Sequence, residues 1–384
     1  RISIRVSLSI HFFFSITSLS IKGSIAIPPP KVKAPILKKA KKIIKGLLLT
    51  FAGFFVILLG IFIAAVVSNV NVIEKNIAFQ NEHLEYLETE YYKDYTPKNE
   101  ADLANFDLEK ATKEGVKLNE IAILGTHNSY QTLATKETRF LMNIIDTITL
   151  KKLGLNTFDF EMDTLTEQLE TGIRNIEIDI ETLDKDGKVE FKVTHNSIVD
   201  NASSAYDFEK ALKEVKMWSD NNPGHVPVII IVEPKSFVVE VGGFHKFSLD
   251  YAKEVDKLVA SVFGDTLLTP ADMLRDYSSF KEMRENDDWI SLKAARGKVL
   301  VLLHDCDVTE SYIAIDESIK TQKMFPMLRY DDRNESYTSF ILENDPWNAD
   351  SRKAESIDEC KFQCGIESCP EDSRNLEVVQ NFCE

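Results

Sequence analysis

The feature that most restricts the fold of this chain is an uncharged apolar run of 23 residues, Gly46 to Ser68. A helix rises about 1.5 Å per residue, so this length crosses the hydrocarbon core of a bilayer, which is about 30 Å thick. A helix buried in a protein core usually keeps a polar stripe, and this run has none. The run therefore predicts a transmembrane signal-anchor helix over residues 46–68. A long signal peptide that is cleaved is the alternative.

The charges beside this run predict its orientation. Seven lysines lie between Lys31 and Lys45, whereas Glu74 and Lys75 follow on the other side. Because basic flanks remain in the cytosol, we expect a single-pass protein whose N-terminus is cytosolic. The body of the chain is then extracellular or lumenal, and it is secreted if the apolar segment is cleaved.

The charge distribution excludes one class of partner. Residues 1–73 contain ten Lys and Arg and no Asp or Glu, so the rest of the chain has 35 basic and 61 acidic residues. Phosphate backbones are bound by basic faces. A body with a net charge of −26 therefore predicts no nucleic-acid partner. Contact with anionic lipids would need cations to mediate it.

Four of the five cysteines lie in the last 25 residues, at positions Cys360, Cys364, Cys369 and Cys383. Outside the cytosol such a cluster predicts disulfide bonds, and the spacing does not pair as zinc-binding knuckles. Asn201-Ala-Ser and Asn334-Glu-Ser match the N-glycosylation pattern, which is a common chance match.

From Leu118 onward, short apolar runs alternate with amphipathic helical segments. The apolar runs are EIAIL, IRNIEIDI, VEFKVT, VPVIIIVE, GKVLVLL and, less clearly, SYTSFIL. Alternation over about 250 residues predicts an α/β fold of the (β/α)8 TIM-barrel type. The last third has fewer clear strands than a closed barrel requires, so we expect a distorted or incompletely closed barrel. A doubly wound sheet is the alternative, but no Gly-rich phosphate loop supports it.

These patterns divide the chain into five parts. They are a basic cytosolic segment (1–45), the transmembrane helix (46–68), a stalk or peripheral helix (69–116), the barrel domain (117–350) and a Cys-rich tail (351–384).

Polar residues gather where the expected strands end, which is where barrel enzymes carry their chemistry. They are His127 with Asn128, Glu177 with Asp179, His195 with Asn196, and Glu233 with Lys235. The i, i+2 spacing of Glu177 and Asp179 places both carboxylates on one face of a strand. In a parallel sheet buried on both faces, such a pair is costly unless a cation compensates it.

Together, three carboxylates and one amide oxygen form an oxygen-rich set. Such a set suits a hard cation, Ca²⁺ or less readily Mg²⁺, rather than zinc. Two histidines beside it can supply donors and acids to a phosphoryl group. Each residue alone has a structural interpretation as a solvated carboxylate or a hydrogen-bonded histidine. We interpret His304 and Asp305, in LLHDCD, as structural.

The stretches GTHNSY, LTEQLETGIRNIEIDI, VTHN and VPVIIIVEPK resemble the catalytic strands of phosphoinositide-specific phospholipases C. The Ca²⁺-dependent, single-domain branch is the most similar. MWSDNNPGHVPV, SVFGDTLLTPADM, ISLKAARGKVLVLL and LENDP extend the likeness in the same order over about residues 117–347. The resemblance implies a distorted TIM barrel that cleaves the glycerophosphate bond of inositol phospholipids.

The resemblance also implies the roles of the individual residues. The Ca²⁺ ligands are Asn128, Glu177, Asp179 and Glu233, and the residues that act on the phosphoryl group are His127 and His195. Glu177 or Glu233 accepts the proton of the inositol 2-hydroxyl, and Lys235 contacts the substrate. The expected products are diacylglycerol and a cyclic inositol phosphate, which water opens in a later step.

Three alternatives stay open. Glycerophosphodiester phosphodiesterases and sphingomyelinase-D-like enzymes are related, although the former begin with His-Arg where this chain has His127-Asn128. The third alternative is a barrel that binds Ca²⁺ or lipid without catalysis. The sequence decides neither the general base nor the head group.

Overall fold

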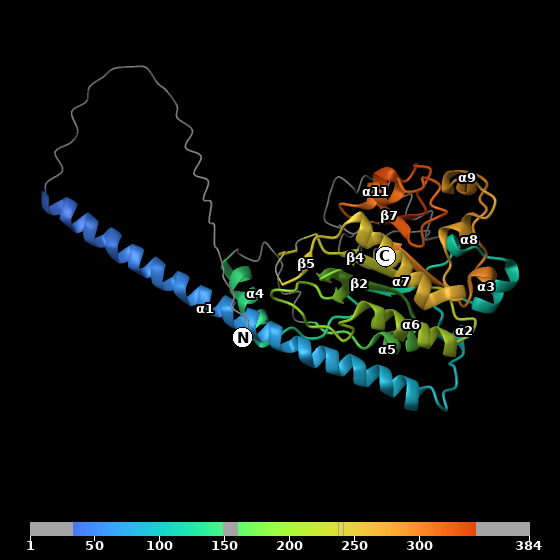
Figure 1. Cartoon of the computed structure of the whole chain (residues 1–384), viewed down its shortest axis with the longest axis horizontal. Helices are drawn as coiled ribbons and strands as arrows, with labels where there is room; N and C mark the ends of the chain where they lie inside the picture. The colour runs from blue at the N-terminus through green and yellow to red at the C-terminus, as the bar shows by residue number, and fades with distance from the viewer. Residues whose placement is uncertain (1–33, 149–159, 237, 241, 343–384) are drawn as a thin grey trace, which may run out of the picture. The chain divides into compact units, whose positions relative to one another are not determined.

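The computed structural model describes residues 34–148, 160–236, 238–240 and 242–342 (Figure 1). The chain divides into two compact units, Arg1–Ile57 and Leu58–Glu384. The predicted disulfides of the Cys-rich tail lie outside the described residues.

The described helices are α1 (Ala34–Tyr86), α2 (Glu100–Leu103), α3 (Leu108–Glu114), α4 (Lys136–Ile148), α5 (Leu165–Glu170), α6 (Phe208–Asn221), α7 (Leu249–Phe263), α8 (Pro270–Leu274), α9 (Phe280–Glu285), α10 (Leu292–Ala295) and α11 (Thr309–Ile313). A π-helical turn, Leu87–Tyr91, continues α1, and short 3-10 turns are η2 (Leu118–Glu120), η4 (Gly264–Thr266) and η5 (Tyr330–Asp332). The strands are β1 (Leu124–Thr126), β2 (Ile173–Lys185), β3 (Lys188–Val193), β4 (Val228–Pro234), β5 (Phe244–His245), β6 (Val299–Leu303), β7 (Phe325–Arg329) and β8 (Phe340–Leu342).

In the first unit, the described residues form the beginning of α1, whose large apolar side chains are exposed. Leu48, Phe51 and Phe55 have exposed fractions of 63%, 69% and 64%. The helical stretch Lys41–Tyr91 is long and apolar enough to cross a membrane, with a mean hydropathy of 2.8 in its most apolar window. Only the length and the composition of the helix support a membrane span, and a signal sequence can be equally long and apolar. The membrane crossing and its orientation therefore stay predictions.

The second unit is built on a curled parallel sheet with the order β1-β2-β4-β6-β7-β8. β3 and β5 pair antiparallel with the long strand β2. The mixed α/β class and the barrel-like curvature agree with the prediction. The parallel path has six strands rather than the eight of a closed barrel, and within the described ranges no ladder joins β8 to β1.

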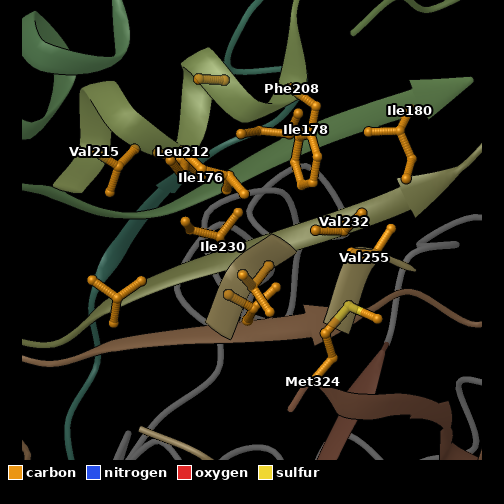
Figure 2. Packing of buried hydrophobic residues seen from close by; sticks show 14 of the residues in the cluster. Ile176, Ile178, Ile180, Phe208, Leu212, Val215, Ile230, Val232, Val255 and Met324 are labelled. Atoms are coloured by element: carbon orange, nitrogen blue, oxygen red, sulfur yellow. The ribbon is translucent and has the colours of Figure 1, made fainter. Parts of the chain in front are cut away.

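The outer face of the sheet forms the main core. Ile176, Ile178 and Ile180 of β2 alternate with polar residues, so all three point to the same side. There they pack against α6 and α7, where Phe208 and Val255 are fully buried (Figure 2). Strands with Ile, Val and Leu at most positions are typical of parallel sheets that are covered on both faces.

The inner face is apolar toward the amino ends of the strands. Leu300 and Leu302 of β6 are buried there, and Ile231 of β4 packs against the same cluster. The pairing of β2 with β4 places Asp179 beside Glu233, at the carboxyl ends. The inner face therefore changes from apolar to acidic along the same strands, and this acidic edge is the candidate site.

Candidate active site

The turn after β1 carries His127 and Asn128. Asn128 has a φ of 48°, in the left-handed region that asparagine tolerates better than most residues. Its N–H donates to Glu177 Oε2 at 3.1 Å, and the N–H of Ser129 donates to the Glu177 carbonyl at 2.9 Å. These bonds hold the turn against β2, so Asn128 lies next to Glu177, which is 49 positions later in the sequence.

His127 and Glu177 form a close ion pair. His127 Nδ1 lies 2.5 Å from Glu177 Oε2, and the Glu177 side chain is only 8% exposed. Burial alone would raise the pKa of Glu177, but the hydrogen bond and the charge of His127 outweigh it and lower that pKa below its usual range. The hydrogen bond to Glu177 raises the pKa of His127. Both shifts favour the ionised partners, a carboxylate beside an imidazolium.

Asp179 is completely buried. Its Oδ2 accepts from the Tyr130 hydroxyl at 2.7 Å and lies 2.6 Å from Lys235 Nζ. Burial, helped by the charges of Glu233 and Glu177, outweighs the attraction of Lys235 and raises the pKa of Asp179 to about 7. Its other oxygen, Oδ1, is buried without a hydrogen-bond partner. An orphaned carboxylate oxygen in such a place is a ready ligand for a cation.

Lys235 lies between two acids at the end of β4. Its Nζ lies 3.1 Å from Glu233 Oε1 in addition to its contact with Asp179. Burial lowers the pKa of Lys235, but the charges of Asp179 and Glu233 outweigh that effect and raise it. One lysine cation therefore compensates two neighbouring carboxylates.

His195 follows β3, and its Nδ1 lies 3.9 Å from Asp200 Oδ2. Burial, together with the positive charges of Lys235 and His127, lowers the pKa of His195 to about 4. Its imidazole is therefore neutral near pH 7. Burial raises the pKa of Asp200 to about 7. The charges of Lys235 and His127 act on His195 because the three side chains lie in the same site.

His304, which we interpreted from the sequence as structural, lies beside two of the candidate ligands. One ligand atom each from Glu177, Glu233 and His304 lies within 4.8 Å of the others. His304 Nδ1 contacts the Asp305 carbonyl at 3.0 Å, which makes Nδ1 the protonated nitrogen and leaves Nε2 as an acceptor. Nε2 is buried without a hydrogen-bond partner. The available signal was alternation, because His304 continues the inward face of Leu300 and Leu302.

The donor set fits Ca²⁺. Ca²⁺ takes oxygen ligands at about 2.3–2.6 Å, so ligands around one ion lie up to about 5 Å apart. Glu177 and Glu233 meet that spacing together with His304. Asp179 is not a member of that group, although its Oδ1 has no hydrogen-bond partner. The side-chain oxygen of Asn128 accepts from the Tyr130 hydroxyl at 3.1 Å, and its role as a ligand stays a prediction.

A cavity of about 490 Å³ lies elsewhere in the second unit. It is lined by residues between Asn105 and Ala122 and by none of the candidate residues. This cavity therefore does not coincide with the acidic edge of the sheet. We take the acidic edge as the better candidate because its ionisable side chains are buried close to one another.

Three solved structures illustrate the similarity to known proteins. Two are crystal forms of a calcium-dependent phosphoinositol-specific phospholipase C from Pseudomonas sp. One is 19% identical, covers 74% of this chain and 93% of that chain, and has a TM-score of 0.46. The other is 22% identical, covers 59% and 71%, and has a TM-score of 0.40. A Ca²⁺-dependent phosphatidylinositol-specific phospholipase C from Streptomyces antibioticus is 17% identical, covers 69% and 91%, and has a TM-score of 0.43. All three scores lie below 0.5, so the family assignment rests on the sequence match.

A family model described as "Phosphoinositide phospholipase C, Ca2+-dependent" matches residues 116–190 and 181–360. No curated protein sequence matches the chain. The two family matches span more than half of the 384 residues and confirm the resemblance seen in the strand-end motifs. Ca²⁺ is therefore the cofactor, and phosphoinositide lipids are the substrate class of the family. The chain belongs to the Ca²⁺-dependent phosphoinositide phospholipase C family and is a phosphoric diester hydrolase.

Proposed function

We propose that this protein cleaves phosphatidylinositol-type lipids to diacylglycerol and a cyclic inositol phosphate. The observation that carries the proposal is the convergence of Glu177, Glu233 and His304 within 4.8 Å, next to the buried Asp179. Four ionisable groups at one sheet edge are costly for folding unless the edge binds a cation or an ionic substrate.

In this proposal, the Ca²⁺ ligands are Asn128, Glu177, Asp179 and Glu233, and His304 lies beside Glu177 and Glu233. When bound, Ca²⁺ lowers the pKa of the inositol 2-hydroxyl and stabilises negative charge on the phosphoryl oxygens. His127 and Lys235 supply the positive charge in the metal-free protein, so we expect Ca²⁺ to compete with both for the carboxylates.

The chain's own residues then move the protons. The oxygen of the inositol 2-hydroxyl attacks phosphorus, and Glu177 or Glu233 accepts its proton. The bond between phosphorus and the diacylglycerol oxygen breaks. His195 gives a proton to that oxygen, which leaves as the hydroxyl of diacylglycerol. Water opens the cyclic phosphate by the reverse route.

The charges of His127 and Lys235 orient the phosphodiester. The protonated His127 donates to a phosphoryl oxygen, and Lys235 contacts the substrate after it leaves Asp179. A bound phosphodiester would also oppose the positive charges that now lower the pKa of His195. Substrate binding would therefore raise that pKa and allow His195 to carry the proton for the leaving group.

We also propose that the apolar part of α1 anchors the enzyme in a membrane, with the N-terminus in the cytosol. The exposed apolar side chains of the first unit support this location. If the helix is an anchor, alkaline carbonate will not extract the protein from membranes. Extraction by carbonate, or recovery of a shortened chain from the medium, would instead support a cleaved signal peptide.

The test of the reaction uses the full chain in mixed micelles with radiolabelled phosphatidylinositol. Cyclic inositol phosphate should appear with Ca²⁺ and disappear with excess chelator, and His127→Ala should abolish it. His245→Ala, on β5 and outside the candidate set, is the matched histidine control and should keep the activity. Full turnover in excess chelator would refute the role of Ca²⁺.

A lipid panel tests the head group. Phosphatidylinositol, glycosylated inositol lipid, glycerophosphodiester and sphingomyelin are offered at equal surface concentration, and the products are separated by thin-layer chromatography. The proposal predicts products only from inositol lipids. Turnover of sphingomyelin or glycerophosphodiester would favour the related enzymes, and no turnover of any lipid would favour a non-catalytic barrel.

A further inference from the structure

Within the second unit, the later part of α1 has a buried face that contains polar side chains. Asn69 and Gln80 are 1% exposed and Asn76 is 8% exposed, whereas the neighbouring Asn71 is exposed. Buried amides are costly unless each finds a hydrogen-bond partner. A stalk that only spaces two parts of a chain needs no buried amides, so the partners of these residues indicate what this part of α1 does.

Two of the amides bind the backbone of a single residue. The N–H of Asn201 donates to Asn69 Oδ1 at 2.6 Å, and Asn76 Nδ2 donates to the Asn201 carbonyl at 2.5 Å. Both backbone groups of Asn201 are thus bonded to α1 across 132 and 125 positions of sequence. Asn201 itself is fully buried, so its match to the glycosylation pattern is a chance match in the folded protein.

Asn201 closes the loop that contains His195. Its side-chain Nδ2 donates to the Ser197 carbonyl at 2.9 Å, and its Oδ1 accepts from Thr194 Oγ1 at 3.1 Å. Thr194, directly before His195, also donates to the Asp200 carbonyl at 2.6 Å. Thr194 and Ser197 flank His195, and both are therefore hydrogen-bonded to Asn201, whose backbone is bonded to α1.

Asp200 completes the connection to the site. Its backbone exchanges two hydrogen bonds with Asn196, at 2.8 and 3.1 Å. Its carboxylate faces His195 Nδ1 at 3.9 Å and accepts from Gln131 at 3.2 Å. A shift of Asn201 would move Asp200 directly, and Asp200 lies against the imidazole.

Other contacts of the same helix reach different elements. Gln80 exchanges two hydrogen bonds with the backbone of Asp207, at 2.8 and 3.0 Å, at the start of α6. His83 lies 3.1 Å from Glu214 on α6. These contacts fasten the helix to the domain, whereas Asn69 and Asn76 fasten the loop of His195 to the helix.

We propose that Asn69 and Asn76 are positioning residues that hold the loop 194–201, and with it His195, in its working geometry. The helix that continues into the apolar segment is then a working part of the catalytic domain rather than a spacer. The part of this proposal that concerns turnover rests on the proposed function. The part that concerns the loop does not.

The test introduces the same substitution, asparagine to aspartate, at two positions of the full chain, which is studied in detergent micelles. Asn76→Asp replaces the donor to the Asn201 carbonyl by a second acceptor. Asn69→Asp keeps the oxygen that accepts from Asn201 but loses the amide that donates to the Ser197 carbonyl at 3.5 Å. Both variants bury the same added carboxylate, so a larger effect of Asn76→Asp reports its shorter hydrogen bond. Asn71→Asp, on the exposed face, controls for the added charge.

Hydrogen exchange of peptides from residues 194–201 is the first measurement. Loss of one buried hydrogen bond should speed exchange there by about ten- to hundredfold in Asn76→Asp. Asn71→Asp should stay within about threefold of the wild type, and Asn69→Asp should speed exchange less than Asn76→Asp, because the hydrogen bond that it loses to Ser197 is long. Unchanged exchange in Asn76→Asp would overturn the proposal. Faster exchange that is equal in β2 and β4 would also overturn it, because it would show a loss of overall stability only.

Turnover of phosphatidylinositol is the second measurement. Asn76→Asp should lower kcat by about tenfold or more and leave KM and the Ca²⁺ half-saturation within about twofold, because the loop carries His195 and no Ca²⁺ ligand. An equal change in all three constants would overturn the positioning role. If the wild type turns over no inositol lipid, the proposed function fails, and the exchange experiment still decides whether α1 holds the loop.

Discussion

The two ends of the inner sheet face have opposite compositions, although the same strands form both. Toward the amino ends, Leu300 and Leu302 are 0% and 2% exposed. Toward the carboxyl ends, the same face carries Asp179, Glu233 and His304. Burial of the leucines stabilises the fold, whereas burial of the acids opposes it. The amino end of the inner face is therefore built for stability, whereas the composition of the carboxyl end opposes folding and makes that end the candidate active site.

The largest effect should come from removing a charge at the acidic end. Glu233→Gln should reduce turnover by about a thousandfold or more, because it removes a proposed Ca²⁺ ligand and one candidate base. The melting temperature of the metal-free protein should stay the same or rise, because the repulsion between Glu233 and Asp179 is lost. Calorimetry measures the melting temperature, and an initial-rate assay measures the turnover. If Glu233→Gln keeps half of the turnover, Glu233 is neither an essential Ca²⁺ ligand nor the general base.

Glu177→Gln distinguishes the base from the ligands. If Glu177 accepts the proton, this variant should bind Ca²⁺ more weakly and stay inactive even at saturating Ca²⁺. If Glu233 is the base, high Ca²⁺ should restore part of the activity of Glu177→Gln and none of that of Glu233→Gln.

The opposite result is expected at the apolar end. Leu300→Ala should lower the free energy of unfolding by about 2–5 kcal/mol, because it leaves a cavity in the buried cluster. Below the melting temperature, kcat and the Ca²⁺ half-saturation should stay within about twofold. Urea unfolding and Ca²⁺-titrated assays measure these quantities. A large change in Ca²⁺ half-saturation would contradict the separation of the two ends.

The next prediction concerns the pH dependence of Ca²⁺ binding. The pKa of Asp179 is raised to about 7 in the metal-free protein, so this acid holds a proton below that pH and must release it to bind a cation. The affinity should therefore fall about tenfold for each pH unit below 7 and level off above it. Asp179→Asn should raise the Ca²⁺ requirement before it abolishes turnover, and it should flatten this dependence. An unchanged slope in that variant would assign the proton to another group.

The smallest effect should come from His304→Ala. The imidazole lies beside Glu177 and Glu233, and charged oxygen ligands determine most of the affinity for Ca²⁺, so the half-saturation should rise about three- to tenfold. Asp305→Asn is the neighbouring control, because the Asp305 carboxylate contacts Arg329 at 2.7 Å. An effect as large as that of Glu233→Gln would make His304 essential to the reaction.

The parts of the site that follow from short-range pattern were predictable from the sequence. The alternation in IEIDI places Glu177 and Asp179 on one face, and apolar runs that end in polar residues locate His127 and Glu233 at the carboxyl edge of the parallel sheet. His195 follows β3, which pairs antiparallel with β2, so the expectation of a parallel strand there was wrong and did not place His195. The resemblance of these motifs to a family supplied the cofactor, and the family match confirmed it.

The remaining features depend on contacts that no local pattern encodes. The pairing of Asp179 with Lys235 follows from the register of β2 with β4. The bond between Asn69 and Asn201 joins residues 132 positions apart, and a lone asparagine on a helix has no pattern that predicts its partner. His304 was predictable by alternation along β6, but its neighbourhood was visible only once β6 was placed beside β4.

The most direct test of the central claim is phosphorus NMR of phosphatidylinositol vesicles that contain the full chain. With Ca²⁺, the signal of the lipid phosphodiester should be replaced by that of a cyclic inositol phosphate. Excess chelator should stop the conversion, and added Ca²⁺ should restart it. Conversion that continues in chelator, or no conversion at saturating Ca²⁺, would contradict the assignment of the acidic edge as a Ca²⁺-dependent catalytic site.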